Sequence, residues 1–348
     1  MFIYFVYLVI LLVLLLLERT SRKGKYLIRT IIPLVFTCFI GFRGISVGVD
    51  TENYVDHYYR HGLYGADYVE KGFDWINRWL YAQGFSAHIF LFVLSAIAVL
   101  FLTLSIRKKE GSEYTIAALC LYLLTFSYLI NSVRQGIAAA ILFFSTEFIE
   151  KKKLVIFLLL ILLGSLFHAS VLLMIPVYFF AQLKLDNLVY VFIYLISFSG
   201  LFIDLSQFIP SFQLFGRDYS IYIDHLRIED ASPLGYIITT TLYVIVFFLM
   251  LNHNIFKKYP VIANLTFIYF VLRNLSFSLP IVLGRIAGYF PWFIFLVYSI
   301  LFNKEERSQF NSVWLAASII IVFNAVLWIH SLLSPANMQI PYLFFWQQ

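Results

Sequence analysis

Long apolar runs, separated by short polar connections, repeat along almost the whole chain. Each run has about 16–20 residues, which at roughly 1.5 Å of rise per residue is enough for a helix to cross a bilayer. Twelve runs lie near residues 2–17, 27–42, 87–106, 114–130, 135–149, 154–168, 169–183, 187–203, 235–252, 260–276, 284–302 and 311–330. This pattern predicts an all-α polytopic membrane protein with about 12 transmembrane helices, organised as a single domain over residues 1–348.

Two longer polar stretches interrupt the apolar pattern, at residues 43–86 and 204–234. Both alternate aromatic with charged side chains, as the segment Tyr64–Trp75 does. A segment of this kind favours short amphipathic helices that lie at the membrane interface. We therefore expect two ordered loops that carry most of the polar chemistry.

The composition narrows the class of protein further. Hydrophobic residues make up 61% of the 348 residues and charged residues only 13%, with 38 Phe and 24 Tyr, so the chain cannot form a soluble surface. Cys38 and Cys120 both lie inside apolar runs, which excludes a disulfide framework. The net charge of +6 lies in connections beside apolar runs, where it sets topology, and we therefore exclude nucleic acid as a partner.

Lysine and arginine are distributed unequally between alternate connections. One set of connections carries sixteen of them and the other set nine. Because basic residues stay on the cytoplasmic side, both termini and both long polar stretches are predicted to face outward. Met1 leads directly into the first apolar run, which is typical of a retained helix and not of a cleaved signal.

A charged residue stands between two apolar runs at Asn131–Gly136, where Arg134 follows the predicted end of one helix and precedes the next. An unpaired guanidinium in hydrocarbon is costly, and the first N–H groups of a helix favour an anion. The arrangement predicts that Arg134 binds phosphate oxygens, with Gln135 and Asn131 close to the ligand. The alternative is an arginine that reaches the outer interface without a ligand.

Two further motifs lie at predicted outer helix ends. The segment Phe42–Tyr54 contains Arg43, Asp50 and Tyr54, and either Arg43 pairs with Asp50 across the turn or both face a ligand. His168 lies in the short connection between two helices. An imidazole can take a proton from a sugar hydroxyl near neutral pH, although a structural histidine fits this position equally well.

Other candidates lie towards the C-terminus. Arg273 and Arg285 flank a predicted outer turn and can share an anion with Arg134. In the second long polar stretch, Arg217 and Tyr219 have the mixed charged and aromatic chemistry that suits sugar rings, although a solvated rim explains most of its charges. The pair His57 and His61 is spaced for one helix face, but no second pair accompanies it, so we expect no metal site. Phosphate-loop, dinucleotide and zinc-protease motifs do not occur.

Three blocks taken together resemble the EpsG-type branch of the Wzy oligosaccharide polymerases. They are Phe42-Arg43-Gly44 with Gly48-Val49-Asp50-Thr51 and Tyr54, then Ser132-Val133-Arg134-Gln135-Gly136, then Phe167-His168-Ala169-Ser170. Their order and spacing fit along nearly the whole chain, and beyond residue 186 the Gly-Arg block at Arg285 adds to them. Val49 stands where the family often has Thr, which leaves Arg43 and Asp50 unchanged.

The resemblance implies a GT-C-like bundle and a glycosyltransferase without cofactor or metal. Such an enzyme joins undecaprenyl-diphosphate-linked oligosaccharide repeat units on the outer face of the bacterial inner membrane, for O-antigen, capsule or exopolysaccharide. Its partners are the lipid-linked donor and acceptor, membrane lipids and, as a further candidate, a regulator of chain length. In this reading Arg134, Arg285, Arg43 and Arg273 bind the diphosphate, His168 or Asp50 is the base, and Tyr54, Gln135, Asn131, Arg217 and Tyr219 bind substrate.

Two other classes of protein compete with this reading. A flippase or transporter for lipid-linked oligosaccharide expects charge through the membrane midplane and symmetry between halves, whereas here charge gathers at the outer margin. A membrane acyltransferase needs a histidine accessible from the cytoplasm, and His168 is predicted on the opposite side. The polymerase is therefore the favoured function.

Overall fold

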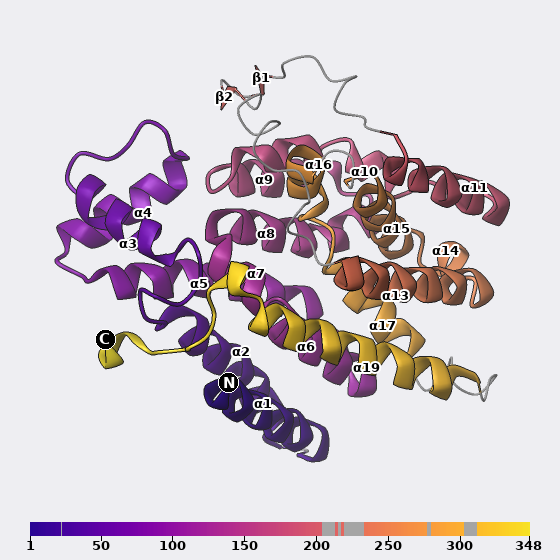
Figure 1. The fold of residues 1–348 in the computed structure, drawn as a ribbon, viewed down its shortest axis with the longest axis horizontal. Helices are drawn as coiled ribbons and strands as arrows, with labels where there is room; N and C mark the ends of the chain where they lie inside the picture. Colours follow the sequence, from indigo (N-terminus) through magenta and orange to yellow (C-terminus); the bar gives the residue numbers. More distant parts are fainter. Residues whose placement is uncertain (22, 204–212, 215–216, 219–232, 277–279, 303–311) are drawn as a thin grey trace.

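The computed structural model describes the chain except residues 22, 204–212, 215–216, 219–232, 277–279 and 303–311 (Figure 1). Its architecture is mainly α-helical, with 14 helices of at least seven residues among the described ones. Within the described part of the chain, two helices, α1 (Phe2–Thr20) and α5 (Ala87–Ile106), have both the length and the hydropathy of a membrane span, and seven further apolar segments have 10–17 residues. The apolar helices indicate a membrane protein, as predicted. The number of crossings stays a prediction.

The N-terminal half is built from one row of long helices with shorter ones beside it. In the row, α1 packs on α2, α2 on α5, α5 on α8 and α8 on α9, which Figure 1 shows as successive layers. The bounds of the elements in this half are α1 (Phe2–Thr20), α2 (Lys25–Gly41), α3 (Thr51–His61), α4 (Lys71–Ala82), α5 (Ala87–Ile106), α6 (Gly111–Leu124), α7 (Phe126–Asn131), α8 (Val133–Glu150) and α9 (Leu154–Ser165).

The C-terminal half packs against α6 and α8 through α15, α17 and α19. A short antiparallel pair, β1 and β2, lies in the second long polar stretch. The bounds here are η1 (Ala169–Met174), α10 (Val177–Phe180), α11 (Asn187–Ser197), η2 (Phe198–Leu201), β1 (Gln213–Leu214), β2 (Arg217–Asp218), α13 (Pro233–Asn252), α14 (Ile255–Lys258), α15 (Pro260–Leu275), α16 (Pro280–Ala287), α17 (Phe293–Leu301), α19 (Ser312–Leu333), η5 (Pro335–Asn337) and η6 (Phe345–Gln347).

Three helices that the sequence predicted as continuous are broken. The run 114–130 divides at Thr125, whose hydroxyl donates back to the Leu121 carbonyl, a bond that bends helices. The run 169–183 becomes η1 and α10, separated by Pro176. Pro291 follows the end of α16 and precedes α17, so the run 284–302 is also divided.

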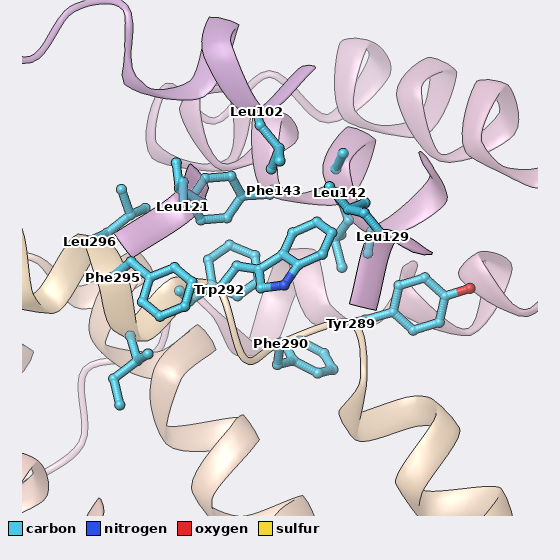
Figure 2. Packing of buried hydrophobic residues seen from close by; sticks show 14 of the residues in the cluster. Leu102, Leu121, Leu129, Leu142, Phe143, Tyr289, Phe290, Trp292, Phe295 and Leu296 are labelled. Atoms are coloured by element: carbon cyan, nitrogen blue, oxygen red, sulfur yellow. The ribbon is translucent and has the colours of Figure 1, made fainter. Parts of the chain in front are cut away.

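The core beside the α7–α8 junction is aromatic. The Trp292 ring meets the Tyr128 ring edge-on at 5.6 Å between centroids and the Phe143 ring at 6.4 Å. Figure 2 shows Trp292 among Leu129, Leu142 and Phe143, with the segment before α17 passing below. Burying rings of this size is worth several kcal/mol, so the segment before α17 fixes the junction from behind.

The first long polar stretch forms two amphipathic helices, as predicted. α3 and α4 stack at one end of the molecule beside the start of α5 (Figure 1). Phe73 and Leu80 of α4 are buried, whereas Trp75 and Trp79 are exposed. The backbone N–H groups of Gly72 and Phe73 both donate to the Leu166 carbonyl, at 2.9 and 3.2 Å, which ties α4 to the end of α9. Their placement at the membrane interface stays a prediction.

The C-terminal segment of the chain returns to the C-terminal end of α2. Gly44 N–H donates to the Leu343 carbonyl at 2.7 Å, and Phe345 N–H donates to the Phe42 carbonyl at 3.1 Å. The Tyr4 hydroxyl, near the start of α1, donates to the Gln339 carbonyl at 2.9 Å. The start of α1 and the end of the chain therefore lie at the same end of the bundle. That both termini face outward stays a prediction.

Candidate functional site

The predicted hinge at Asn131–Gly136 is a real break in the helix. Ser132 has φ −128° and ψ 54°, which is not helical, so α7 ends at Asn131 and α8 begins at Val133. The Asn131 side-chain oxygen accepts from the Val49 N–H at 2.8 Å. Gly48 has φ +89°, and an added Cβ would lie 2.2 Å from Ile130, so only glycine lets this turn approach the hinge.

Arg134, in the first turn of α8, is paired with a carboxylate. Its Nη1 donates to Glu70 Oε2 at 2.6 Å, and its guanidinium lies 5.3 Å from the centre of the Phe73 ring. The second oxygen of Glu70 accepts from the Ala169 N–H at 3.2 Å and lies 3.5 Å from His168 Nδ1. Glu70 thus joins Arg134 of α8 to His168, two residues that the sequence predicted as functional.

Glu70 is held in its charged form. Burial alone would raise its pKa, but the nearby His168 ring, Arg134 and the Ala169 N–H outweigh burial and lower the pKa from its usual 4.5 to about 2. The separation of 3.5 Å from His168 Nδ1 is too long for a hydrogen bond, so a small rotation of the ring is needed to form one. Sequence reasoning missed Glu70 because it is one carboxylate among several in its stretch and no fixed spacing links it to Arg134.

Asp50 and Tyr54 lie beside Arg134 in a cavity of about 380 Å³. The cavity is formed by α3, the segment before α4, and Arg134. Its lining side chains are Asp50, Asn53, Tyr54, Asp56, His57, Arg60, His61, Tyr68, Val69, Phe73 and Arg134. Burial raises the pKa of Asp50, while Asn53 and the guanidinium of Arg134 act in the opposite direction. Arg134, Asp50 and Tyr54 are therefore brought together.

Arg43 lies apart from this cavity and is fully buried. Its Nε donates to the Thr51 hydroxyl at 2.8 Å, and its two other nitrogens donate to the carbonyls of Ile40 and Ile130. Each guanidinium nitrogen therefore has a partner inside the protein. These contacts join α2, α3 and α7, and within the described residues no ion pair links Arg43 to Asp50.

The other predicted site residues lie in different parts of the structure. Arg285 of α16 is exposed, and its carbonyl accepts from the Gln135 side-chain nitrogen at 2.6 Å, which places this end of α16 against the first turn of α8. Arg273 of α15 contacts α13, where its Nη2 lies 3.4 Å from the Thr239 hydroxyl and its guanidinium 5.5 Å from the Tyr236 ring centre. The backbone of Arg217 lies in β2, and Tyr219 lies outside the described residues.

His57 and His61 stand one turn apart on α3, with ring centroids 4.9 Å apart. In the part of the chain that the structure describes, no three His, Cys, Asp or Glu side chains gather where they could hold a metal ion. His57 instead faces Tyr68, with 3.1 Å between His57 Nδ1 and the Tyr68 hydroxyl. The arrangement around Arg134 therefore offers ion pairing, a candidate base and an open cavity.

Comparison with known families matches residues 26–344 to the EpsG family. The match covers all three blocks that the sequence resemblance rests on, as well as Glu70. No curated protein matches this chain, and no solved structure matches it.

Proposed function

Because this chain belongs to the EpsG family, which is linked to polysaccharide biosynthesis, we propose that it is a polysaccharide polymerase. It joins undecaprenyl-diphosphate-linked oligosaccharide repeat units, as a glycosyltransferase that uses neither a metal ion nor a nucleotide sugar. The reaction takes place on the outer face of the bacterial inner membrane. The observation that carries this proposal is the position of the Glu70 carboxylate between Arg134 and His168. Arginine is a residue suited to binding phosphate, and histidine is one suited to accepting a proton.

His168 is the base in this mechanism. A hydroxyl oxygen of the acceptor sugar forms a bond to the anomeric carbon of the donor, and the bond from that carbon to the diphosphate oxygen breaks. The hydroxyl proton passes to Nε2 of His168, the ring nitrogen remote from Glu70. Glu70 favours the tautomer with the proton on Nδ1, which leaves Nε2 basic. Asp50 is the second candidate, since burial raises its pKa and it lies beside Arg134.

The leaving diphosphate needs cations. Arg134 shares one N–H with Glu70, and its remaining donors and the exposed Arg285 serve the diphosphate. Fixed cations at the place where charge develops lower the barrier without a metal ion. Arg43 has a partner for each nitrogen, so we assign it to holding the turn of Asp50 in place. Arg273 is kept as an auxiliary cation, and Tyr54, Gln135 and Asn131 as residues that shape the site.

The experiment is conversion of purified lipid-linked repeat units by the purified protein in detergent, analysed as ladders on a gel. The expected result is a ladder that persists with a chelator and is lost with Arg134→Ala, while single units accumulate. A lipid-linked oligosaccharide transporter would move labelled units across vesicles and form no ladder. Absence of any ladder from correctly folded protein, in the presence of donor and acceptor, would overturn the polymerase.

A further inference from the structure

The cavity beside Arg134 has features that the proposed reaction leaves unused. Most of its lining comes from α3 and from the segment leading into α4, outside the Glu70–Arg134–His168 contacts. Its volume of about 380 Å³ falls in the range of small-molecule sites, which is roughly 300–1,000 Å³. Arg134 belongs both to this cavity and to the ion pair with Glu70, so the two regions are continuous.

Aromatic rings line one wall of this cavity. His57 lies 5.2 Å from Phe73 and 5.8 Å from Tyr68 between ring centroids, and His61 lies 5.4 Å from Tyr68. Tyr54 stands 6.1 Å from Phe73. Ring faces of this kind pack against the C–H faces of sugars while polar edges remain for hydroxyl groups. The wall therefore suits a ligand with one apolar face and many polar edges.

The side chain of His57 gives the most specific indication of a ligand in this cavity. The residue is 9% exposed, and its Nδ1 faces the Tyr68 hydroxyl at 3.1 Å. Its Nε2 is buried and has no hydrogen-bond partner among the described residues. A buried polar atom without a partner costs stability unless a ligand satisfies it. Since a sugar hydroxyl both donates and accepts, it satisfies Nε2 in either tautomer.

Charge in the cavity is balanced. Asp56 and Arg60 pair with each other at 2.6 Å on the α3 side. Burial lowers the pKa of His57 to about 4, with His61 and Arg134 acting in the same direction, so this imidazole is neutral at pH 7. Asp50 and Asn53 add acceptors and an amide. A neutral polyol fits such a mixture better than a free anion or a metal ion does.

We propose that this cavity is the subsite for the terminal sugar of the acceptor, with His57 and Tyr68 as the residues that recognise its hydroxyl groups. The proposal rests on the proposed polymerase function and says which substrate end lies there. The acceptor is assigned because Arg134 lines the cavity and also pairs with Glu70, whose other oxygen lies 3.5 Å from His168 Nδ1. A sugar bound in the cavity can therefore present a hydroxyl towards His168. The donor diphosphate then lies on the side of Arg285.

The test measures binding apart from catalysis. The probe is the oligosaccharide released by mild acid from the host's lipid-linked repeat units, and saturation-transfer NMR on detergent-purified protein gives its Kd. His57→Phe keeps the ring and removes the nitrogens, and Tyr68→Ala shortens the exposed rim. Tyr59→Ala, on the same helix, exposed and outside the cavity, is the matched control. Each variant is first checked for a wild-type thermal unfolding temperature.

We expect wild type and His168→Ala to bind the oligosaccharide saturably, with the same Kd. For His57→Phe and for Tyr68→Ala we expect a Kd at least tenfold higher. The Kd of Tyr59→Ala should equal that of wild type. Where His57→Phe does not fold, the Tyr68→Ala result decides. No saturable binding by wild type, or the wild-type Kd in both cavity variants, overturns the subsite. If His57→Phe makes ladders with the acceptor KM of wild type, the subsite is also overturned, whereas the polymerase function is kept. His57-dependent binding without any ladder from wild type would keep a sugar site at His57 but overturn the polymerase, and with it the assignment to the acceptor.

Discussion

Two carboxylates at opposite ends of the bundle, Glu18 and Glu70, both form ion pairs but differ in their surroundings. Glu18 at the end of α1 is 2% exposed, with Arg29 Nε at 2.8 Å and Lys25 Nζ at 4.0 Å. Arg29 also bonds Glu110 and lies 3.9 Å above the Tyr114 ring. Glu70 at the other end has Arg134 at 2.6 Å and His168 Nδ1 at 3.5 Å, beside an open cavity.

The two sites differ in whether the buried polar atoms near each carboxylate all have hydrogen-bond partners. Around Glu18 the cations fix α1, α2 and α6 to one another, and no described side chain of that cluster has a buried polar atom lacking a partner. Beside Glu70, His168 Nδ1 is buried without a hydrogen bond, and so is His57 Nε2 in the cavity that Arg134 lines. Such atoms need an explanation, and a bound ligand is one. We therefore infer that the ion pair of Glu18 serves stability and propose that the ion pair of Glu70 serves binding and chemistry.

The strongest test of this contrast is His168→Ala. Removing a general base costs about 10²–10⁴-fold in rate, so ladders should disappear from steady-state assays of the purified variant. The comparison variant is His330→Ala, which changes an exposed histidine of α19. Equal ladder formation by wild type and His168→Ala would remove His168 from the reaction and leave Asp50 as the candidate.

Glu70→Gln tests whether the carboxylate acts through its partners. The amide keeps the size but loses the charge that holds Arg134 and favours one tautomer of His168, so we expect kcat to fall about 10- to 100-fold. Acceptor KM should change much less, because the cavity remains. A higher acceptor KM with an unchanged kcat would mean that Glu70 contacts the sugar and does not position the base.

Glu18→Gln is the counterpart at the other end. Weakening this buried ion pair should cost up to about 3 kcal/mol of stability, because Arg29 and Lys25 lose a charged partner in a buried place. Thermal unfolding in detergent is expected to occur at a lower temperature, with the specific activity of the folded protein within about twofold of wild type. A loss of specific activity that matched the loss in Glu70→Gln would erase the distinction between the two carboxylates.

The smallest effect is a dependence of stability on pH. The pKa of Glu70 falls from 4.5 to about 2 on folding, so its charged form stabilises the folded state. The contribution is fully present above about pH 4.5 and is lost as the pH falls towards 2. The unfolding temperature of wild type should therefore exceed that of Glu70→Gln by a constant amount above pH 5 and approach it below. A difference that vanished already at pH 6 would contradict the lowered pKa.

The sequence alone predicts the class of fold and the family well. Runs of 16–20 apolar residues predict helices directly, and α5 begins and ends at the predicted residues 87 and 106. The positions of the breaks were less predictable, because apolar content continues through Thr125 and Pro291 while backbone bonding does not. The resemblance to the EpsG family is confirmed over residues 26–344.

The site is predictable only for residues that stand out against apolar neighbours. Arg134 is a charge between two hydrophobic runs, so its place at the start of α8 follows from local pattern. Glu70 and His57 lie among many polar residues. Their proposed roles rest on the pairing of Glu70 with Arg134 and on the cavity that His57 shares with Arg134, both far apart along the chain. Periodicity within one helix carries no information about such distant pairs.

The bonds between the turn of Phe42–Gly48 and the segment from Met338 onwards have a consequence for synthesis in the cell. Ile45 N–H donates to the Gln348 side chain, and these two residues are 303 positions apart. Gly48 N–H, two residues before Asp50, donates to the Met338 carbonyl at 2.7 Å. The turn that carries Asp50 thus emerges from the ribosome early but gains these bonds only after α19 has been synthesised. These bonds therefore form late in synthesis, after every element between Gly48 and Met338 has been made.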